Sequence, residues 1–218
     1  MKSHSRTVLP DPGTALLARV GSLDDAVTAG HAGATVIEVG VGGPSLIAAI
    51  REWLPGVVIC GADASADLVP DPRLALHSGA SLICPGIAAA EKARRNGIDP
   101  ERILVTVPMT RLDRTLQAGW STLTDVDSGA DDLGVAGAEA LAAACCWLGG
   151  TAVRTRHVAE VRRSLDAAEA ALGTPRPGWN VRRALAKMAG ALGQRKDANH
   201  RKDADHKDRD ADHKDRSV

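Results

Sequence analysis

Two arginines separated by one residue, Arg154 and Arg156, have the type and spacing that best suit a chemical task in this sequence. They lie in the stretch Gly-Thr-Ala-Val-Arg-Thr-Arg-His-Val at 150–158, which predicts a short strand that leads into a helix. Side chains alternate along a strand, so we expect both guanidinium groups on one side. Two like charges on one side repel each other unless an anion, or solvent, lies between them. The pair therefore predicts either a phosphate-type anion site or a solvated strand end.

Four acidic residues lie at or just past the ends of other predicted strands: Glu38, Asp63, Asp125 and Asp127. In an α/β barrel the carboxyl ends of the strands form the functional face. With the two arginines, these acids would form a mouth that holds an anion in a bidentate clamp. The alternative is that they cap the following helices or pair with the arginines themselves.

Short runs of Val, Ile and Leu alternate with helical stretches along the chain, and Gly, Pro, Asp or Ser marks the joins. The predicted strands cover 16–20, 35–39, 57–60, 81–84, 103–107, 121–126 and 152–156. The predicted helices cover 23–32, 44–53, 72–78, 87–96, 112–118, 135–148 and 158–172. Seven strand-helix units in series predict a parallel sheet with helices outside it.

The Gly-Ala pair that precedes a Val/Leu-Ile strand occurs twice, at 33–37 and at 79–83, and favours a closed barrel. No Gly-x-Gly-x-x-Gly follows the first strand, which counts against a dinucleotide-binding sheet. We therefore predict an α/β fold, a TIM-barrel-like (β/α) barrel with one βα unit missing or degenerate. The expected domains are a flexible N-terminus (1–14), the barrel (15–190) and a disordered tail (191–218).

The predicted tail follows from composition. Residues 195–216 carry eight Lys or Arg, seven Asp and three His, with no apolar residue larger than Ala. Such a segment cannot bury enough apolar surface to offset the entropy of ordering it.

The amino-acid composition also limits the classes of partner that we expect for this chain. The 27 basic and 27 acidic residues balance, and Phe and Tyr are absent, so we expect no nucleic-acid partner. The chain has no apolar run of membrane-spanning length, and its first 20 residues lack the apolar segment typical of a secretory leader. We therefore expect no membrane partner and a cytoplasmic location. The four cysteines have no metal-binding spacing, and reduced, mostly buried thiols are expected.

The order of these segments resembles that of dihydropteroate synthase and its pterin-binding barrel relatives, over about residues 16–172. Gly-Ala-Thr-Val-Ile-Glu-Val-Gly at 33–40 is similar to the family's second strand, Gly-Ala-x-Ile-Ile-Asp-Val-Gly. Residues 59–65 resemble the third-strand segment that holds an Asp, and 75–85 resemble the fourth. Residues 143–158 resemble the closing strand, Gly-Ala-x-x-Val-Arg-x-His-Asp-Val, with Arg154 at the anion-binding arginine and Arg156 at the histidine.

The resemblance implies a transferase of folate biosynthesis that joins a pterin methyl diphosphate to 4-aminobenzoate. It implies substrate binding by Glu38, Asp63, Arg154 and Arg156, a magnesium cofactor, a pterin or other phosphate-bearing ligand, and a homodimer. The arginines would stabilise the departing diphosphate.

Several family motifs are replaced here. Cys84-Pro85 stands in place of Asn-Asp, and Asp127-Ser128-Gly129 aligns with the Ser-Arg-Lys whose lysine holds the pterin. Nothing between residues 8 and 20 matches the loop whose Asn touches magnesium. The sequence thus leaves two hypotheses, a synthase and a catalytically silent binding or regulatory relative with a degenerate active site.

Overall fold

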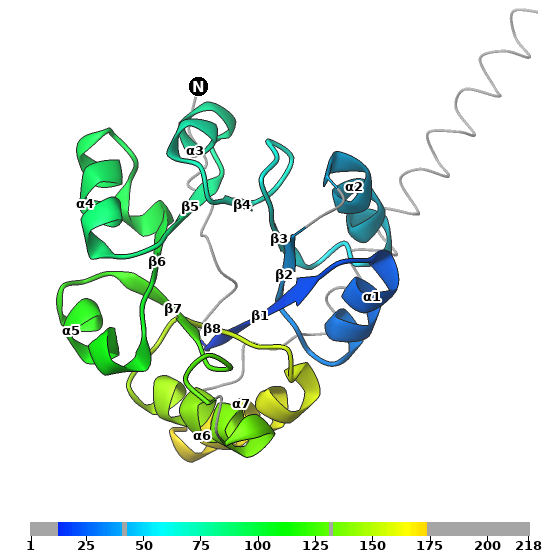
Figure 1. Ribbon diagram of the computed structural model, residues 1–218, viewed down its shortest axis with the longest axis vertical. Helices are drawn as coiled ribbons and strands as arrows, with labels where there is room; N and C mark the ends of the chain where they lie inside the picture. Colours follow the sequence, from blue (N-terminus) through cyan, green and yellow to red (C-terminus); the bar gives the residue numbers. More distant parts are fainter. Residues whose placement is uncertain (1–12, 41–42, 131–132, 174–218) are drawn as a thin grey trace, which may run out of the picture. The chain divides into compact units, whose positions relative to one another are not determined.

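The computed structural model describes residues 13–40, 43–130 and 133–173. Over these residues, eight parallel strands pair in chain order and β8 pairs with β1, which closes the sheet into a barrel (Figure 1). The predicted α/β, TIM-barrel-like fold is therefore confirmed. The strands are β1 (Ala15–Val20), β2 (Val36–Val39), β3 (Val58–Cys60), β4 (Leu68–Val69), β5 (Ser81–Cys84), β6 (Ile103–Thr106), β7 (Ser121–Asp125) and β8 (Ala152–Arg154).

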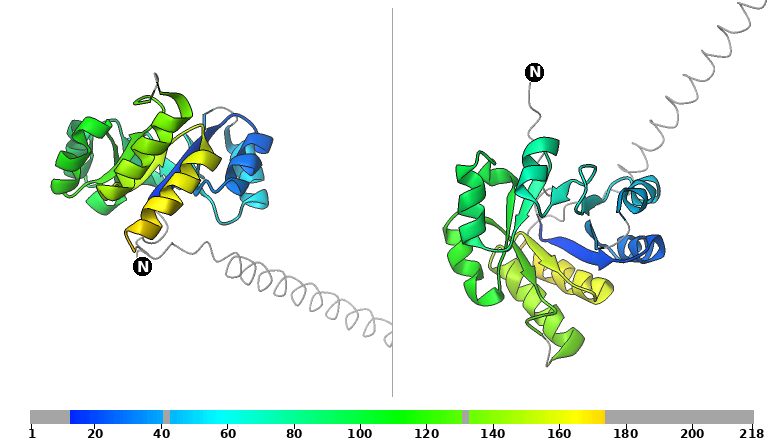
Figure 2. Two further views of the ribbon diagram at one scale, coloured as in Figure 1. Left: turned by 90° about the horizontal axis from the view of Figure 1, so that it is seen from below. Right: turned by 45° about the horizontal axis from the view of Figure 1, so that its top comes forward.

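Seven α-helices of the described residues surround the barrel (Figure 2). Each lies within one residue of its predicted bounds at both ends. They are α1 (Leu23–His31), α2 (Gly43–Trp53), α3 (Pro72–Ser78), α4 (Ile87–Arg95), α5 (Leu112–Gln117), α6 (Gly134–Trp147) and α7 (Val158–Ala171).

The degenerate unit is the third one. The chain passes from β3 to β4 through residues 61–67 without a helix, and β4 pairs with β3 at Cys60 and with β5 at Ser81. The expectation of seven strands was wrong, because a two-residue strand shows no hydrophobic periodicity. The prediction that one unit is degenerate is confirmed, since this unit keeps its strand and lacks its helix.

Local signals explain the accuracy of the helix bounds. The Asp71 side chain accepts a hydrogen bond from the Arg73 amide at 2.8 Å, with Pro72 as the first helical residue of α3. The helix ends at Gly79, whose φ of 74° is a left-handed conformation that favours glycine. The side chain of Ser22 caps α1 in the same way by accepting from the Asp25 amide at 3.1 Å.

Strand alternation divides the core into two layers. Ala15 and Leu17 of β1 face the barrel interior, where they pack with inward residues of the other strands. Leu16 and Ala18 face the helices and belong to the larger cluster between sheet and helices. The next inward position of β1 is Arg19, so the interior changes from apolar to charged at the carboxyl end of the strands.

A buried polar contact joins the last described helix to the first strand. Glu169 of α7, 2 % exposed, accepts a hydrogen bond from the Thr14 amide at 3.0 Å, just before β1. Its other oxygen accepts from Arg162 Nη2 at 3.1 Å, and Arg162 also pairs with Asp166 at 2.8 Å. This contact, which we call the seam, fixes α7 against the start of the barrel.

Some predictions lie partly or wholly outside the described residues. They are the flexible N-terminus up to residue 12, the end of the barrel beyond 173, and the charged tail at 191–218. All four cysteines are buried thiols, as predicted. Among the described residues, no helix has the length and apolar character needed to cross a membrane.

Candidate functional site

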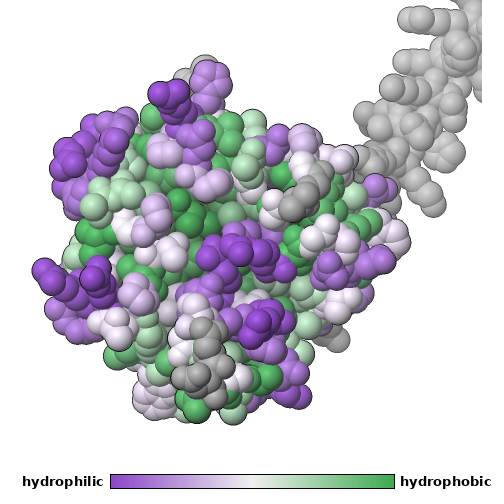
Figure 3. Space-filling view, in the orientation of Figure 1, coloured by the Kyte–Doolittle hydropathy of each residue, from purple (hydrophilic) through white to green (hydrophobic). Residues whose placement is uncertain are grey.

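The charged residues at the mouth come from four neighbouring strands. Arg19 of β1 lies opposite Glu38 of β2 in the strand register, and Asp125 of β7 lies opposite Arg154 of β8. Leu17 is the partner of Arg154, so Arg19 stands two residues nearer the mouth, one inward layer above it. Hydrophilic side chains gather near the centre of the face shown in Figure 3, inside the ring of helices.

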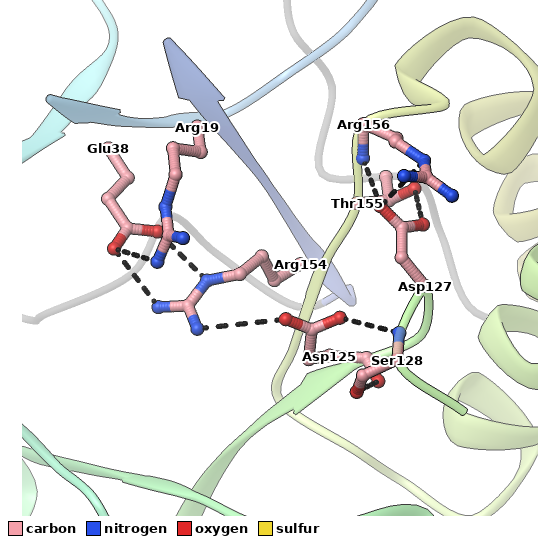
Figure 4. Close-up of polar contacts among 8 residues, drawn as sticks. All are labelled: Arg19, Glu38, Asp125, Asp127, Ser128, Arg154, Thr155 and Arg156. Atoms are coloured by element: carbon pink, nitrogen blue, oxygen red, sulfur yellow. Dashed lines mark hydrogen bonds and ion pairs between the residues drawn. The ribbon is translucent and has the colours of Figure 1, made fainter. Parts of the chain in front are cut away.

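The Glu38 carboxylate lies between two guanidinium groups (Figure 4). Its Oε1 accepts from Arg19 Nη2 at 3.1 Å and from Arg154 Nη2 at 3.3 Å, and its Oε2 lies 2.8 Å from Arg154 Nε. The side chains of Glu38 and Arg154 are 15 % and 17 % exposed, whereas that of Arg19 is 63 % exposed. Arg154 therefore lies deep in the mouth, largely shielded from solvent. The more exposed Arg19 contacts the same Glu38 carboxylate from the side of β1.

The residues at and just after the end of β7 form the other side of the site. Asp125 Oδ1 accepts from the Ser128 amide at 3.1 Å, and its Oδ2 lies 3.9 Å from Arg154 Nη1. Asp127 accepts from Thr155 Oγ1 at 2.6 Å and from the Arg156 amide at 2.7 Å. Both carboxylates are thus engaged by groups of the protein itself.

An open pocket of about 350 Å³ lies at the mouth of the barrel, and Glu38 is not among the residues that line it. An arginine presents five N–H donors, so three arginines offer more donors than the engaged carboxylates can accept. The surplus makes the pocket suited to an anion with several acceptor oxygens. The lining residues are Arg19, Asp125, Asp127, Ser128, Arg154, Thr155 and Arg156.

The two arginines of the predicted clamp both line this pocket, but strand periodicity does not relate them. Strand β8 ends at Arg154, two residues earlier than predicted. The Arg156 side chain is 71 % exposed, and its Nε donates to His157 Nε2 at 3.2 Å. In Figure 4 its guanidinium group lies apart from that of Arg154. The prediction that both side chains point to one side of a strand was wrong for this reason.

Asp63 is not among the residues that line the pocket. It lies in the connection from β3 to β4, where its Oδ1 accepts from the amide and the hydroxyl of Ser65 at 2.8 and 2.6 Å. Hydrogen bonds from the Ser65 hydroxyl and amide lower the pKa of Asp63. In the structure, the Asp63 carboxylate therefore stabilises a local turn.

Arg19 was missed by the sequence analysis. Its signal is a single charged residue near the carboxyl end of an otherwise apolar strand, Ala-Leu-Leu-Ala-Arg-Val. Counting by twos from the inward Ala15 and Leu17 would have placed it in the mouth. The hydrogen bond and the charge of Glu38 raise the pKa of Arg19, which keeps the guanidinium protonated.

Cys60 lies directly beside this charged layer, opposite Glu38 in the β2–β3 register. Burial, and then the charge of Glu38, raise its pKa to about 12. The thiol is therefore protonated at neutral pH and unsuited to act as a nucleophile.

Magnesium was expected from the family resemblance alone, and the residues present do not fit it. Within the described parts of the chain, no group of three or more His, Cys, Asp or Glu side chains is placed to hold a metal ion. Magnesium prefers carboxylate oxygens that are free to bind it. Here Glu38 faces two guanidinium groups, and the oxygens of Asp127 accept two hydrogen bonds.

The fold and this pocket define the class of the protein: a closed parallel α/β barrel with a charged pocket at the carboxyl ends of its strands. No protein-family model and no curated protein matches the sequence significantly. Solved structures with the same fold include the dihydropteroate synthases, so the resemblance drawn from the sequence is confirmed at the level of fold.

Three of these structures illustrate the likeness. The Rv1207 protein of Mycobacterium tuberculosis shares 22 % identity over 79 % of this chain and 99 % of its own, with a TM-score of 0.62. The dihydropteroate synthase of Yersinia pestis shares 14 % over 74 % of this chain and 93 % of its own, with a TM-score of 0.60. That of Xanthomonas albilineans, solved with 7,8-dihydropteroate, shares 13 % over 75 % and 94 %, with a TM-score of 0.61.

Proposed function

We propose that this chain is a dihydropteroate-synthase-like protein of folate metabolism that binds a phosphate-bearing pterin at the mouth of its barrel. The main support for the proposal is the pocket at the carboxyl ends of β1 and β8, which Arg19, Arg154 and Arg156 all line. This is the end of an α/β barrel where phosphate groups are commonly bound. The fold shared with dihydropteroate synthases supports a pterin as the remainder of the ligand.

In this proposal Arg154 contacts one phosphate group, the exposed Arg156 contacts another part of the same ligand, and Glu38 orients Arg154 before the ligand binds. Asp63 would act on the ligand from the connection between β3 and β4, although it is not among the residues that line the pocket. Asp63→Asn therefore tests its assignment separately from the arginines. Unchanged affinity in that variant would limit the role of Asp63 to the turn it forms with Ser65.

The test is a calorimetric titration of the full chain with 6-hydroxymethyl-7,8-dihydropterin diphosphate and, separately, with inorganic pyrophosphate. Binding of both is expected, with the pterin compound the tighter. Arg94→Gln is the matched control, because Arg94 is an exposed arginine paired with Glu91 on α4, away from the mouth. Absence of binding by either compound would refute the proposal.

A second candidate, a catalytically silent binding or regulatory relative, is favoured by one observation. Arg154 is already paired with Glu38 at 2.8 Å, so its charge is largely neutralised before any diphosphate arrives. An arginine in this state stabilises a departing anion less well. Incubation with the pterin diphosphate, 4-aminobenzoate and magnesium distinguishes the two candidates, since robust pteroate formation refutes the silent one.

We further propose that the chain forms a homodimer through α6. Large apolar side chains remain exposed at both ends of this helix, with Leu133 72 % and Trp147 58 % exposed. Val135 and Leu148 are exposed near them in sequence, so each end of the helix carries two exposed apolar side chains. Grouped apolar surface is typical of protein–protein contacts. Light scattering after size-exclusion chromatography is expected to give twice the chain mass, and Trp147→Glu to shift it to the monomer. A monomer at all concentrations would contradict the proposal.

A further inference from the structure

The Glu38 carboxylate occupies the position in which an anionic ligand would meet two arginines at once. It contacts Arg19 at 3.1 Å and Arg154 at 2.8 and 3.3 Å (Figure 4). A phosphate oxygen bound by the same two guanidinium groups would need the same donors. The protein therefore carries its own carboxylate in what would otherwise be an anion site.

This internal pairing is close but not well aligned. Glu38 Oε2 and Arg154 Nε are 2.8 Å apart, yet neither buried atom takes part in an aligned hydrogen bond among the described residues. The two atoms form an ion pair without the alignment of a good hydrogen bond, so an acceptor in line with the Arg154 Nε–H would bind it better. An anion with several oxygens, free to adjust its position, could supply that geometry.

The arginine that completes the site is Arg19 rather than Arg156. Arg19 lines the pocket, is 63 % exposed and converges with Arg154 on one carboxylate. The Arg156 side chain is 71 % exposed and directs its Nε toward His157. The pair able to grip one anion in the floor of the pocket is thus Arg19 with Arg154.

We propose that Arg19 and Arg154 form the anion-receiving pair of the mouth pocket, and that Glu38 is a resident carboxylate which the incoming anion displaces. The inference rests on the proposed function only in that the pocket binds an anion. A tethered carboxylate competes at a high effective concentration. Acetate has the same acceptor group as the Glu38 side chain and gains no contact by replacing it. We therefore expect the wild-type pocket not to bind acetate. A phosphate or pyrophosphate brings more charge and more acceptor oxygens, so Glu38 makes the pocket selective for phosphate-type anions.

The experiment measures pyrophosphate, phosphate and acetate affinities of the full chain by calorimetry, in the wild type, Glu38→Gln and Arg19→Gln. Glu38→Gln keeps the shape of the side chain and removes its charge. We expect it to tighten pyrophosphate binding about tenfold or more and to admit acetate, because hydrogen bonds to charged groups carry this magnitude. Arg19→Gln is expected to weaken pyrophosphate binding to a similar degree.

Glu91→Gln is the matched control, because Glu91 forms an exposed 2.8 Å pair with Arg94 on α4. Its anion affinities should equal those of the wild type. Far-UV circular dichroism and thermal melting establish that each variant folds. If Glu38→Gln does not fold, the Arg19→Gln result decides alone: unchanged affinity overturns the inference and a loss supports it.

The outcomes separate this inference from the proposed function. If the wild type binds pyrophosphate but Glu38→Gln binds it no more tightly, the displacement of Glu38 is refuted and the proposed function stands. If only Glu38→Gln binds, the inference is supported and the proposed function fails for the native chain. If neither binds any of these anions, both are refuted.

Discussion

Glu169 joins α7 to the residue just before β1 at the seam, and its replacement by alanine is expected to be strongly destabilising. The side chain is 2 % exposed and accepts hydrogen bonds from the Thr14 amide at 3.0 Å and from Arg162 Nη2 at 3.1 Å. Glu169→Ala leaves that buried amide without its acceptor and removes one of the two carboxylates that face Arg162.

The magnitude follows from these two losses. An unsatisfied buried donor costs about 1–3 kcal/mol, and breaking a buried ion pair costs about 3–5 kcal/mol. The second figure must be reduced, because Arg162 is 17 % exposed and keeps Asp166 at 2.8 Å. We expect a loss of about 3 kcal/mol in the free energy of unfolding, or a fall in Tm of roughly 6–12 °C for a domain of this size.

Urea denaturation followed by circular dichroism measures the change. Glu91→Ala is the control, since its pair with Arg94 is exposed and should contribute less than about 1 kcal/mol. Glu169→Gln, which retains an acceptor for the Thr14 amide, should fall between the control and Glu169→Ala. If Glu169→Ala and Glu91→Ala lose equal stability, the seam contributes no more to the stability of the fold than an exposed ion pair does.

Three further predictions concern the site and its surroundings. Arg154→Ala should lower stability by about 1–3 kcal/mol, because the partly buried Glu38 carboxylate then keeps only Arg19 as its partner. Arg156→Ala removes an exposed side chain and should stay within about 0.5 kcal/mol of the wild type. Equal losses in urea denaturation would contradict this difference. Gly150→Ala places a Cβ 2.2 Å from Cys145 Sγ. The overpacking should lower the free energy of unfolding by about 1–3 kcal/mol, and an unchanged Tm would contradict that close approach. Burial raises the pKa of Cys60 to about 12, so this thiol should react with a thiol reagent at pH 8 only after unfolding. Mass spectrometry that finds Cys60 labelled in the native protein would show that the interior is open.

Local signals in the sequence account for most of the fold. Ser22, Asp71 and Pro72 mark helix starts through backbone chemistry that acts within a few residues. The seven helices could be placed within one residue for that reason. The short β4 could not, because Leu68 and Val69 carry no pattern of their own and become a strand only by pairing with β3 and β5.

For the site, the sequence determined which residue types stand at the strand ends, and the tertiary structure decided which of them meet. Glu38 and Arg154 are 116 positions apart, and only closure of the barrel brings them to 2.8 Å. The position of Arg156 depended on where β8 stops, which the pairing of Arg154 with β1 and β7 sets. Side-chain direction along a strand is a local property that the chain encodes by alternation. Contact across the mouth is set by strand register, which depends on residues far apart in the chain and was decided only in the folded barrel.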